Sequence, residues 1–179
     1  MSQAISKEKT SRIMEAILAE LEEEAKTTLR VLERVPEDKL TWKPHDKSMS
    51  LGQLALHIAN TPGGVSGMIV EDSYELSPEA FQNQPSPASR ADIIATLQKG
   101  LAEARKNLSG FDDVSAMATW TVTSAGKQLM AVPKAVFLRN VLLNHSYHHR
   151  GQLSVYLRLL NVPVPSIYGP SADENPFAA

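Results

Sequence analysis

Residues 133–160, PKAVFLRNVLLNHSYHHRGQLSVYLRLL, carry the longest helical pattern in the chain and decide the fold. Large side chains recur there at steps of three or four residues, at Leu138, Leu142, His145, His149, Leu153, Tyr156 and Leu160. Because residues at that spacing share one face of an α-helix, the pattern predicts a long amphipathic helix. Pro133 is tolerated in a first helical turn, whereas Pro163 and Pro165 end the pattern.

Three further helical patterns precede this one. Residues 8–34 form an amphipathic pattern, and a second pattern begins after Ser48 or Ser50, both good N-caps. A third begins at a Ser89 cap and runs to about residue 108. Four helices with little strand predict an all-α fold, a four-helix bundle with long loops.

Several segments interrupt or connect these helices. Thr61-Pro62-Gly63-Gly64 falls inside the second pattern, and we expect a break or sharp kink there because proline cannot donate and glycine is costly inside a helix. Residues 119–130 alternate in a β-like way and predict a short hairpin that turns at 124–127. The other connections are expected to be loops, and they are residues 36–50, 73–89 and a C-terminal strap at 162–179.

Length and composition predict one domain of ordinary size over residues 1–179. Hydrophobic residues make up 42% and charged residues 21%, as in globular proteins, and the formal net charge of −2 gives no reason to expect nucleic-acid binding. The absence of cysteine excludes disulfides, cysteine-based zinc sites and a cysteine nucleophile. Neither a signal peptide nor a long apolar run is evident, so we expect no membrane span and a cytoplasmic location.

Three of the five histidines lie within five consecutive positions of the last helix, at His145, His148 and His149. His145 and His149 are four residues apart on the inward stripe, so their rings are stacked on one face and can bind a single ion. His148 is one residue off the stripe and is expected at its edge. Neutral imidazoles suit Zn, Ni, Fe or Cu, but a site needs at least a third ligand.

The third ligand has two candidates. His57 follows Leu51 and Leu54 at helical spacing and so lies on or beside an apolar face, whereas His45, in a loop, is the weaker alternative. A lone histidine on an apolar face is more often a hydrogen-bonded core residue than a ligand. Two adjacent buried imidazoles, however, would each need a partner, at a cost of about 1–3 kcal/mol per unpaired polar group. A cation shared with His57 removes that cost, so we predict a divalent transition-metal site.

Other residues near the histidines have two interpretations each. Amide side chains that can orient the imidazoles, or only form bonds on the surface, are Gln53, Asn60, Asn144 and Gln152. Arg150 either meets an anionic group of a substrate or forms an interhelical ion pair, and Trp42 and Tyr168 either line a pocket or pack. Ser146 and Ser154 lie near the histidines, but neither is in a G-x-S-x-G turn, which disfavours a Ser-His-Asp hydrolase.

Two long stretches resemble the DinB-like family. Residues 144–174, NHSYHHRGQLSVYLRLLNVPVPSIYGPSADE, are similar to its C-terminal signature, including H-x-x-x-H-R-G-Q-L and the V-P-x-x-Y-G-P-S-A-D-E tail. Residues 32–60, LERVPEDKLTWKPHDKSMSLGQLALHIAN, resemble its other block, with W-x-P-H and the L-G-x-L-x-x-H-I helix. The two stretches cover about a third of the chain, in the family's order and separation.

This resemblance implies a fold, a metal and a chemistry. Members of the family are four-helix bundles, often dimers, with a divalent metal held by three histidines, which match His57, His145 and His149 and leave out His148. Wider relatives are thiol-dependent S-transferases and isomerases that use bacillithiol, mycothiol or glutathione. The resemblance thus implies a homodimer that binds Zn, Ni or Fe and transfers a small thiol, as co-substrate, to a small-molecule electrophile. A metal-dependent hydrolase and a non-catalytic, stress-associated metal-binding protein are the alternatives.

Overall fold

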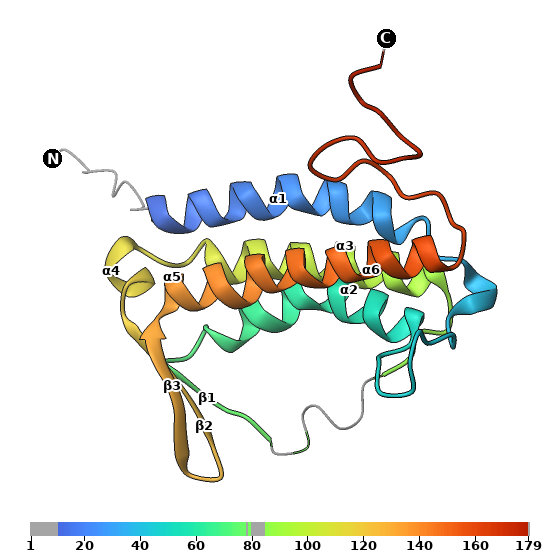
Figure 1. The fold of residues 1–179 in the computed structure, drawn as a ribbon. Helices are drawn as coiled ribbons and strands as arrows, with labels where there is room; N and C mark the ends of the chain where they lie inside the picture. The colour runs from blue at the N-terminus through green and yellow to red at the C-terminus, as the bar shows by residue number, and fades with distance from the viewer. Residues whose placement is uncertain (1–10, 78, 80–84, 179) are drawn as a thin grey trace, which may run out of the picture.

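The structure is a computed structural model that describes residues 11–77, 79 and 85–178 (Figure 1). Its four long helices are α1 (Arg12–Leu32), α2 (Leu51–Met68), α3 (Arg90–Leu108) and α6 (His145–Leu159). Helices α3 and α6 each pack against both α1 and α2, which confirms the predicted four-helix bundle. The first residues of the predicted N-terminal helix, 8–10, lie outside the described part of the chain. No helix within the described residues is long and apolar enough to cross a membrane.

Serine side chains begin three of these helices. Ser11, Ser50 and Ser89 each accept a hydrogen bond from the backbone N–H three residues further on. Ser50 and Gln53 also form a reciprocal capping box. Each bond satisfies an amide that has no partner inside its own helix. Helices α2 and α3 therefore start where the sequence predicts, whereas α1 begins at Arg12 and not at residue 8.

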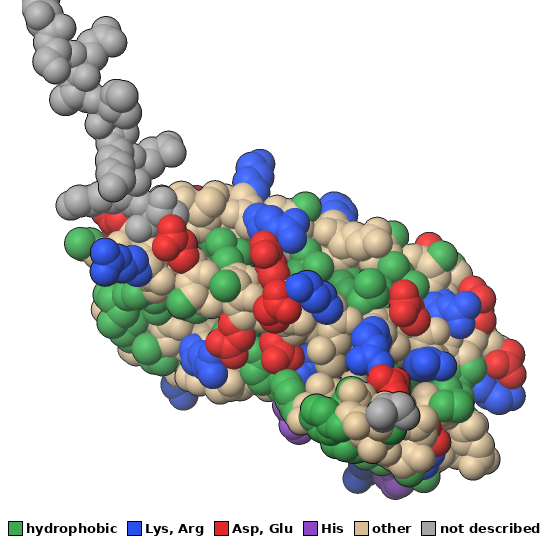
Figure 2. All heavy atoms as spheres, turned by 90° about the horizontal axis from the view of Figure 1, so that it is seen from above, with side chains coloured by type: hydrophobic (Ala, Val, Ile, Leu, Met, Phe, Trp, Pro, Cys, Tyr) green, Lys and Arg blue, Asp and Glu red, His purple; other side chains and the backbone are tan. Residues whose placement is uncertain are grey.

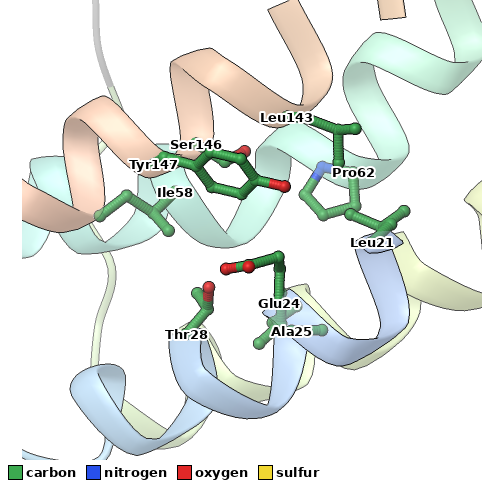
Figure 3. Close-up of a pocket in the computed structure, with 10 residues that line it drawn as sticks. Leu21, Glu24, Ala25, Thr28, Ile58, Pro62, Leu143, Ser146 and Tyr147 are labelled. Carbon is green, nitrogen blue, oxygen red and sulfur yellow. The ribbon is translucent and has the colours of Figure 1, made fainter. Parts of the chain in front are cut away.

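The predicted break at Pro62 is wrong, because α2 runs without interruption from Leu51 to Met68. Tight packing against α3 explains the two residues that mislead. A Cβ added to Gly63 would lie 3.0 Å from the Cα of Gly100, so glycine lets the two backbones touch. Pro62 has no N–H to donate to the carbonyl of Ile58, four residues earlier. Both residues line a small cavity of about 10 Å³ between α1, α2 and α6 (Figure 3).

A three-stranded sheet projects from one end of the bundle (Figure 1). Its strands are β1 (Ser73–Glu75), β2 (Thr119–Ser124) and β3 (Lys127–Pro133), in the order β1-β2-β3. Strands β2 and β3 form the predicted antiparallel hairpin, with positive φ at Ala125 and Gly126 in its two-residue turn. Strand β1 pairs parallel to β2 and corrects the prediction of a loop over 73–89. Its three residues are too few to show an alternating pattern.

The helical segment that follows β3 is continuous, as the sequence predicts, but it is not α-helical throughout. It comprises α5 (Lys134–Phe137), a π-helix η2 (Leu138–Asn144) and α6. A π-helix bonds five residues apart, so its side chains turn less per residue than α-helical spacing assumes. Asn161, with a φ of 57°, ends α6 in the left-handed conformation common after a helix.

The C-terminal tail is the predicted strap. Glu174 pairs with Arg30 of α1, and Asp173 pairs with Arg158 of α6, so the tail lies across the end of these helices (Figure 1). The loop before α2 contains a short 3₁₀ turn, η1 (Glu37–Lys39), and packs through Trp42 edge-on to Tyr156. Seen from the α1 side, acidic and basic side chains are intermingled and form no continuous basic area (Figure 2).

Candidate metal centre

Three histidines from two helices meet where α2 faces α6. His57 lies near the middle of α2, His145 is the first residue of α6, and His149 lies one turn later. The Nε2 atoms of His57 and His145 are 2.9 Å apart, and one ring nitrogen from each histidine lies within 4.8 Å of the other two. The ring centroids are 5.1, 4.6 and 4.3 Å apart, with planes close to perpendicular. The structure therefore brings all three predicted ligands together, and they can hold a metal ion.

The hydrogen bonds of the rings suit a cation. Gln152 Oε1 lies 2.7 Å from His149 Nδ1 and can only accept, so Nδ1 carries the proton and the lone pair is on Nε2. His57 and His145 share one proton between their Nε2 atoms, and a metal ion would take its place. With His149, they would offer an ion three neutral imidazole nitrogens, a donor type that suits Zn, Ni or Fe. The donor set thus fits a divalent transition metal.

Burial keeps the three imidazoles in their neutral, ligating form. Desolvation, with repulsion from His149 and His145, lowers the pKa of His57 from 6.5 to about 4. Desolvation is also the main cause that lowers the pKa of His145 and of His149, although the Gln152 hydrogen bond partly opposes it at His149. Neutral imidazole is the form that binds metal, so the site is ready for an ion at neutral pH.

Two other histidines stay outside the cluster. His45 is exposed in its loop and accepts a hydrogen bond from the backbone N–H of Lys47. His148 is exposed on α6, and its ring centroid lies 4.9 Å from that of His149, but it is not one of the three converging histidines. The structure therefore leaves His57 as the third member, in agreement with the stronger of the two sequence candidates.

Of the four amide residues predicted to orient the imidazoles, Gln152 forms a hydrogen bond with one of them. Gln152 holds His149, whereas Gln53 caps α2 and Asn144 lies 3.5 Å from Asn140 on the same helix. Asn60 borders the cavity described below. The two serines that a Ser-His-Asp hydrolase would use instead bond to helix carbonyls, Ser146 to Leu142 and Ser154 to Gly151.

Arg150 faces α1 and is 1% exposed. Its guanidinium lies 2.6 Å from Glu24 Oε2 and donates to Thr28 Oγ1 and to the hydroxyl of Tyr168. It also lies over the ring of Tyr147, 5.4 Å from its centroid. Of the two predicted roles for Arg150, the interhelical ion pair is confirmed. Tyr168 is 70% exposed and ties the C-terminal strap to α6 and α1 through Arg150 and Glu24.

The histidines form part of the wall of a cavity of about 670 Å³, a volume typical of ligand pockets. Its buried part contains Trp120 and Phe137, whose ring centroids are 4.1 Å apart. Its exposed rim includes Leu129 and Met130 of β3. Sequence reasoning missed these residues, since alternation predicts a hairpin but gives no sign that the hairpin faces the histidines.

Comparison with known proteins decides the family. The family model of the DinB family matches residues 1–176. The chain belongs to the DinB family. It is 26% identical over 166 residues to the uncharacterised protein YrdA of Bacillus subtilis strain 168, which covers 90% of this DinB-family chain and 91% of YrdA.

Solved structures show the same DinB fold. A DinB-like protein from Bacillus cereus ATCC 10987 has a TM-score of 0.64 at 23% identity and covers 86% of this chain and 97% of its own. The DinB-like protein YjoA from Bacillus subtilis has a TM-score of 0.62 at 20% identity and covers 85% and 97%. The DinB-like bundle that the sequence predicts is therefore confirmed.

Proposed function

We propose that this DinB-family protein is a metal-dependent transferase that joins a small thiol to an electrophile. The ion would be held by His57, His145 and His149. The observation that carries the proposal is that these rings form part of the wall of the 670 Å³ cavity. An ion that only stabilised the bundle would need no such cavity beside it, which supports turnover over a non-catalytic role.

The chain's own groups would bind and orient the reactants. When bound, a divalent ion supplies the charge that keeps a thiol deprotonated. The three imidazoles leave positions open for that thiol, and Gln152 fixes the ring of His149. Because the chain has no cysteine, the sulfur must arrive with a co-substrate. The sulfur forms a bond to carbon, the leaving group departs with the electrons of its broken bond, and the thiol proton is released.

The cavity supports thiol transfer over the alternative of hydrolysis. Among the described residues that line it, none is an aspartate or glutamate that could act as general base. A metal-dependent hydrolase that uses a carboxylate as its general base would therefore find none in this wall. The homodimer and the cytoplasmic location stay predictions.

The test combines a measurement of bound metal with a colorimetric assay of thiol transfer. Protein stripped with EDTA is reloaded with Zn, Ni or Fe, and the bound metal is measured by elemental analysis. Benzyl mercaptan and 1-chloro-2,4-dinitrobenzene then serve as an uncharged thiol and electrophile, which give a thioether, chloride and a proton. We expect one metal per chain and turnover with at least one of the three ions.

Matched variants locate the site. His145→Ala and His149→Ala should lose both the metal and the activity. His148→Ala removes an adjacent, exposed histidine of the same helix and should retain both. Equal metal content in all four proteins would overturn the ligand assignment, and full metal without any thiol transfer would favour the non-catalytic alternative.

A further inference from the structure

We infer that the cavity beside the histidines selects ligands with an uncharged, apolar body and excludes charged ones. The inference deepens the proposed function. It rests on that function only to say which end of the ligand reacts. Seventeen residues line the cavity, and none of these described residues is Lys, Arg, Asp or Glu. Besides the three histidines and the hydroxyl of Tyr74, its uncharged polar side chains are Asn60 and Thr61, which lie three and four residues after His57 on α2.

The rest of the wall is made of aliphatic and aromatic side chains. Trp120 and Phe137 are 1% and 6% exposed, and Val122 and Val141 pack against the same apolar cluster. The indole N–H of Trp120, the one polar atom of that residue, donates to the carbonyl of Met68 at 3.1 Å and is already used. This part of the wall therefore offers a ligand contact area without hydrogen bonds.

Two charged side chains on the neighbouring elements, Lys134 and Glu75, are paired elsewhere. Lys134, 3% exposed at the start of α5, lies 3.0 Å from Asp72 and 5.1 Å from the ring centroid of Phe111. Glu75 of β1 accepts a hydrogen bond from Thr123. A carboxylate or sulfonate placed against Trp120 and Phe137 would lose its water and gain no countercharge, so it is excluded. A thiol co-substrate with carboxylates must keep them outside the cavity.

Two fluorescent probes that differ only in charge test this inference. N-phenyl-1-naphthylamine is neutral, and 1-anilinonaphthalene-8-sulfonate carries the same rings with a sulfonate. The chain has two tryptophans, and Trp42 does not line the cavity. In a Trp42→Phe background, quenching of Trp120 by energy transfer measures probe binding, and a change in the cavity variants assigns that binding to the cavity. The titrations use metal-free protein in EDTA, so that the cavity is measured without the ion.

The expected result is that the neutral probe binds at least about tenfold more tightly than the sulfonate, a difference of about 1.4 kcal/mol. Val122→Lys should reduce that preference by about tenfold, with folding checked by far-ultraviolet circular dichroism. Leu129→Lys, at a rim position already 53% exposed, is a second variant that should shift the preference in the same direction. Val155→Lys, 57% exposed on α6 and away from the cavity, should leave it unchanged.

Equal affinity for the two probes, or a preference that no lysine variant changes, would overturn the inference. This outcome is distinct from failure of the proposed function, which is measured by metal content and thiol transfer in the loaded protein. A cavity that prefers the neutral probe in a protein that binds no metal would leave the inference standing and remove the proposed function.

Discussion

Helix α6 carries a polar cluster on each of two sides, and the two clusters differ in what they need. Toward α1, the buried guanidinium of Arg150 meets the Glu24 carboxylate and the hydroxyls of Thr28 and Tyr168. The cavity on that side holds only about 10 Å³, the space of one water (Figure 3). Toward α2, three neutral imidazoles converge beside about 670 Å³ of open space.

The two clusters differ in whether their hydrogen-bond donors and acceptors already have partners within the chain, which distinguishes a structural cluster from a binding site. Around Arg150, both terminal nitrogens of the guanidinium meet oxygens, and burial raises the pKa of Tyr147 and of Tyr168, so both stay protonated at neutral pH. Around His57, one nitrogen from each of three rings lies within 4.8 Å of the other two, an arrangement that a cation would complete. Four measurements can break or sharpen this contrast.

The largest expected effect is on the α1 side. Arg150→Met should lower the free energy of unfolding by about 3–5 kcal/mol, because it leaves the carboxylate of Glu24 largely buried without its cation. Urea unfolding in EDTA measures the change. The control, Arg30→Met, removes a half-exposed partner of Glu174 and should cost no more than about 1 kcal/mol. Similar small losses in both variants would show that the Arg150 cluster is not a structural clamp.

Acid should destabilise the metal-free protein through the histidine side. The pKa of His57 is about 4 in the folded chain and 6.5 when unfolded, so the unfolded state binds more protons between these values. Its contribution, less than about 3 kcal/mol because solvent screens a half-buried ring, is present above pH 6.5 and is lost as the pH falls toward 4. Urea unfolding across this range in EDTA should show the slope, and His57→Gln should flatten it. An unchanged slope in the variant would contradict the assignment.

Helix α2 also has a structural side and a binding side, since Gly63 packs against α3 and His57 faces the cavity. Gly100→Ala should cost about 1–3 kcal/mol, since its Cβ would lie 3.0 Å from the backbone nitrogen of Gly63. Thermal unfolding measures this loss. Gly151→Ala, exposed on α6 with nothing within 4 Å of the added carbon, should instead stabilise by up to about 1 kcal/mol. Equal effects at both positions would mean that the helices do not pack this closely.

The smallest effect concerns metal affinity alone. Gln152→Ala should weaken metal binding by about tenfold or more, because His149 loses the acceptor that fixes its tautomer. The side chain is exposed, so the stability of the metal-free protein should change by less than about 0.5 kcal/mol. Competition with a coloured chelator gives the affinity. Asn144→Ala, an exposed amide on the preceding turn, is the control and should bind metal as the parent does.

Most of the bundle and all three histidines follow from local rules in the sequence. Serine caps, helical spacing and the His145/His149 step of four are properties of single helices, and they are confirmed as geometry. The tertiary contacts are what the sequence hides. Pro62 and Gly63 read as a break because the partner that makes glycine useful, Gly100, lies on another helix. The cavity wall was missed for the same reason, since nothing local places β2 beside α2.

The hairpin has a consequence for how such a protein can change over generations. Its ladder is formed within residues 119–133, so its pairing does not depend on the helices that carry the histidines. Leu129 and Met130 are 53% and 40% exposed, and substitution at such positions costs little stability. Mutations can therefore accumulate at the exposed positions of the hairpin and change the shape of the cavity, while the bundle keeps the three histidines in place.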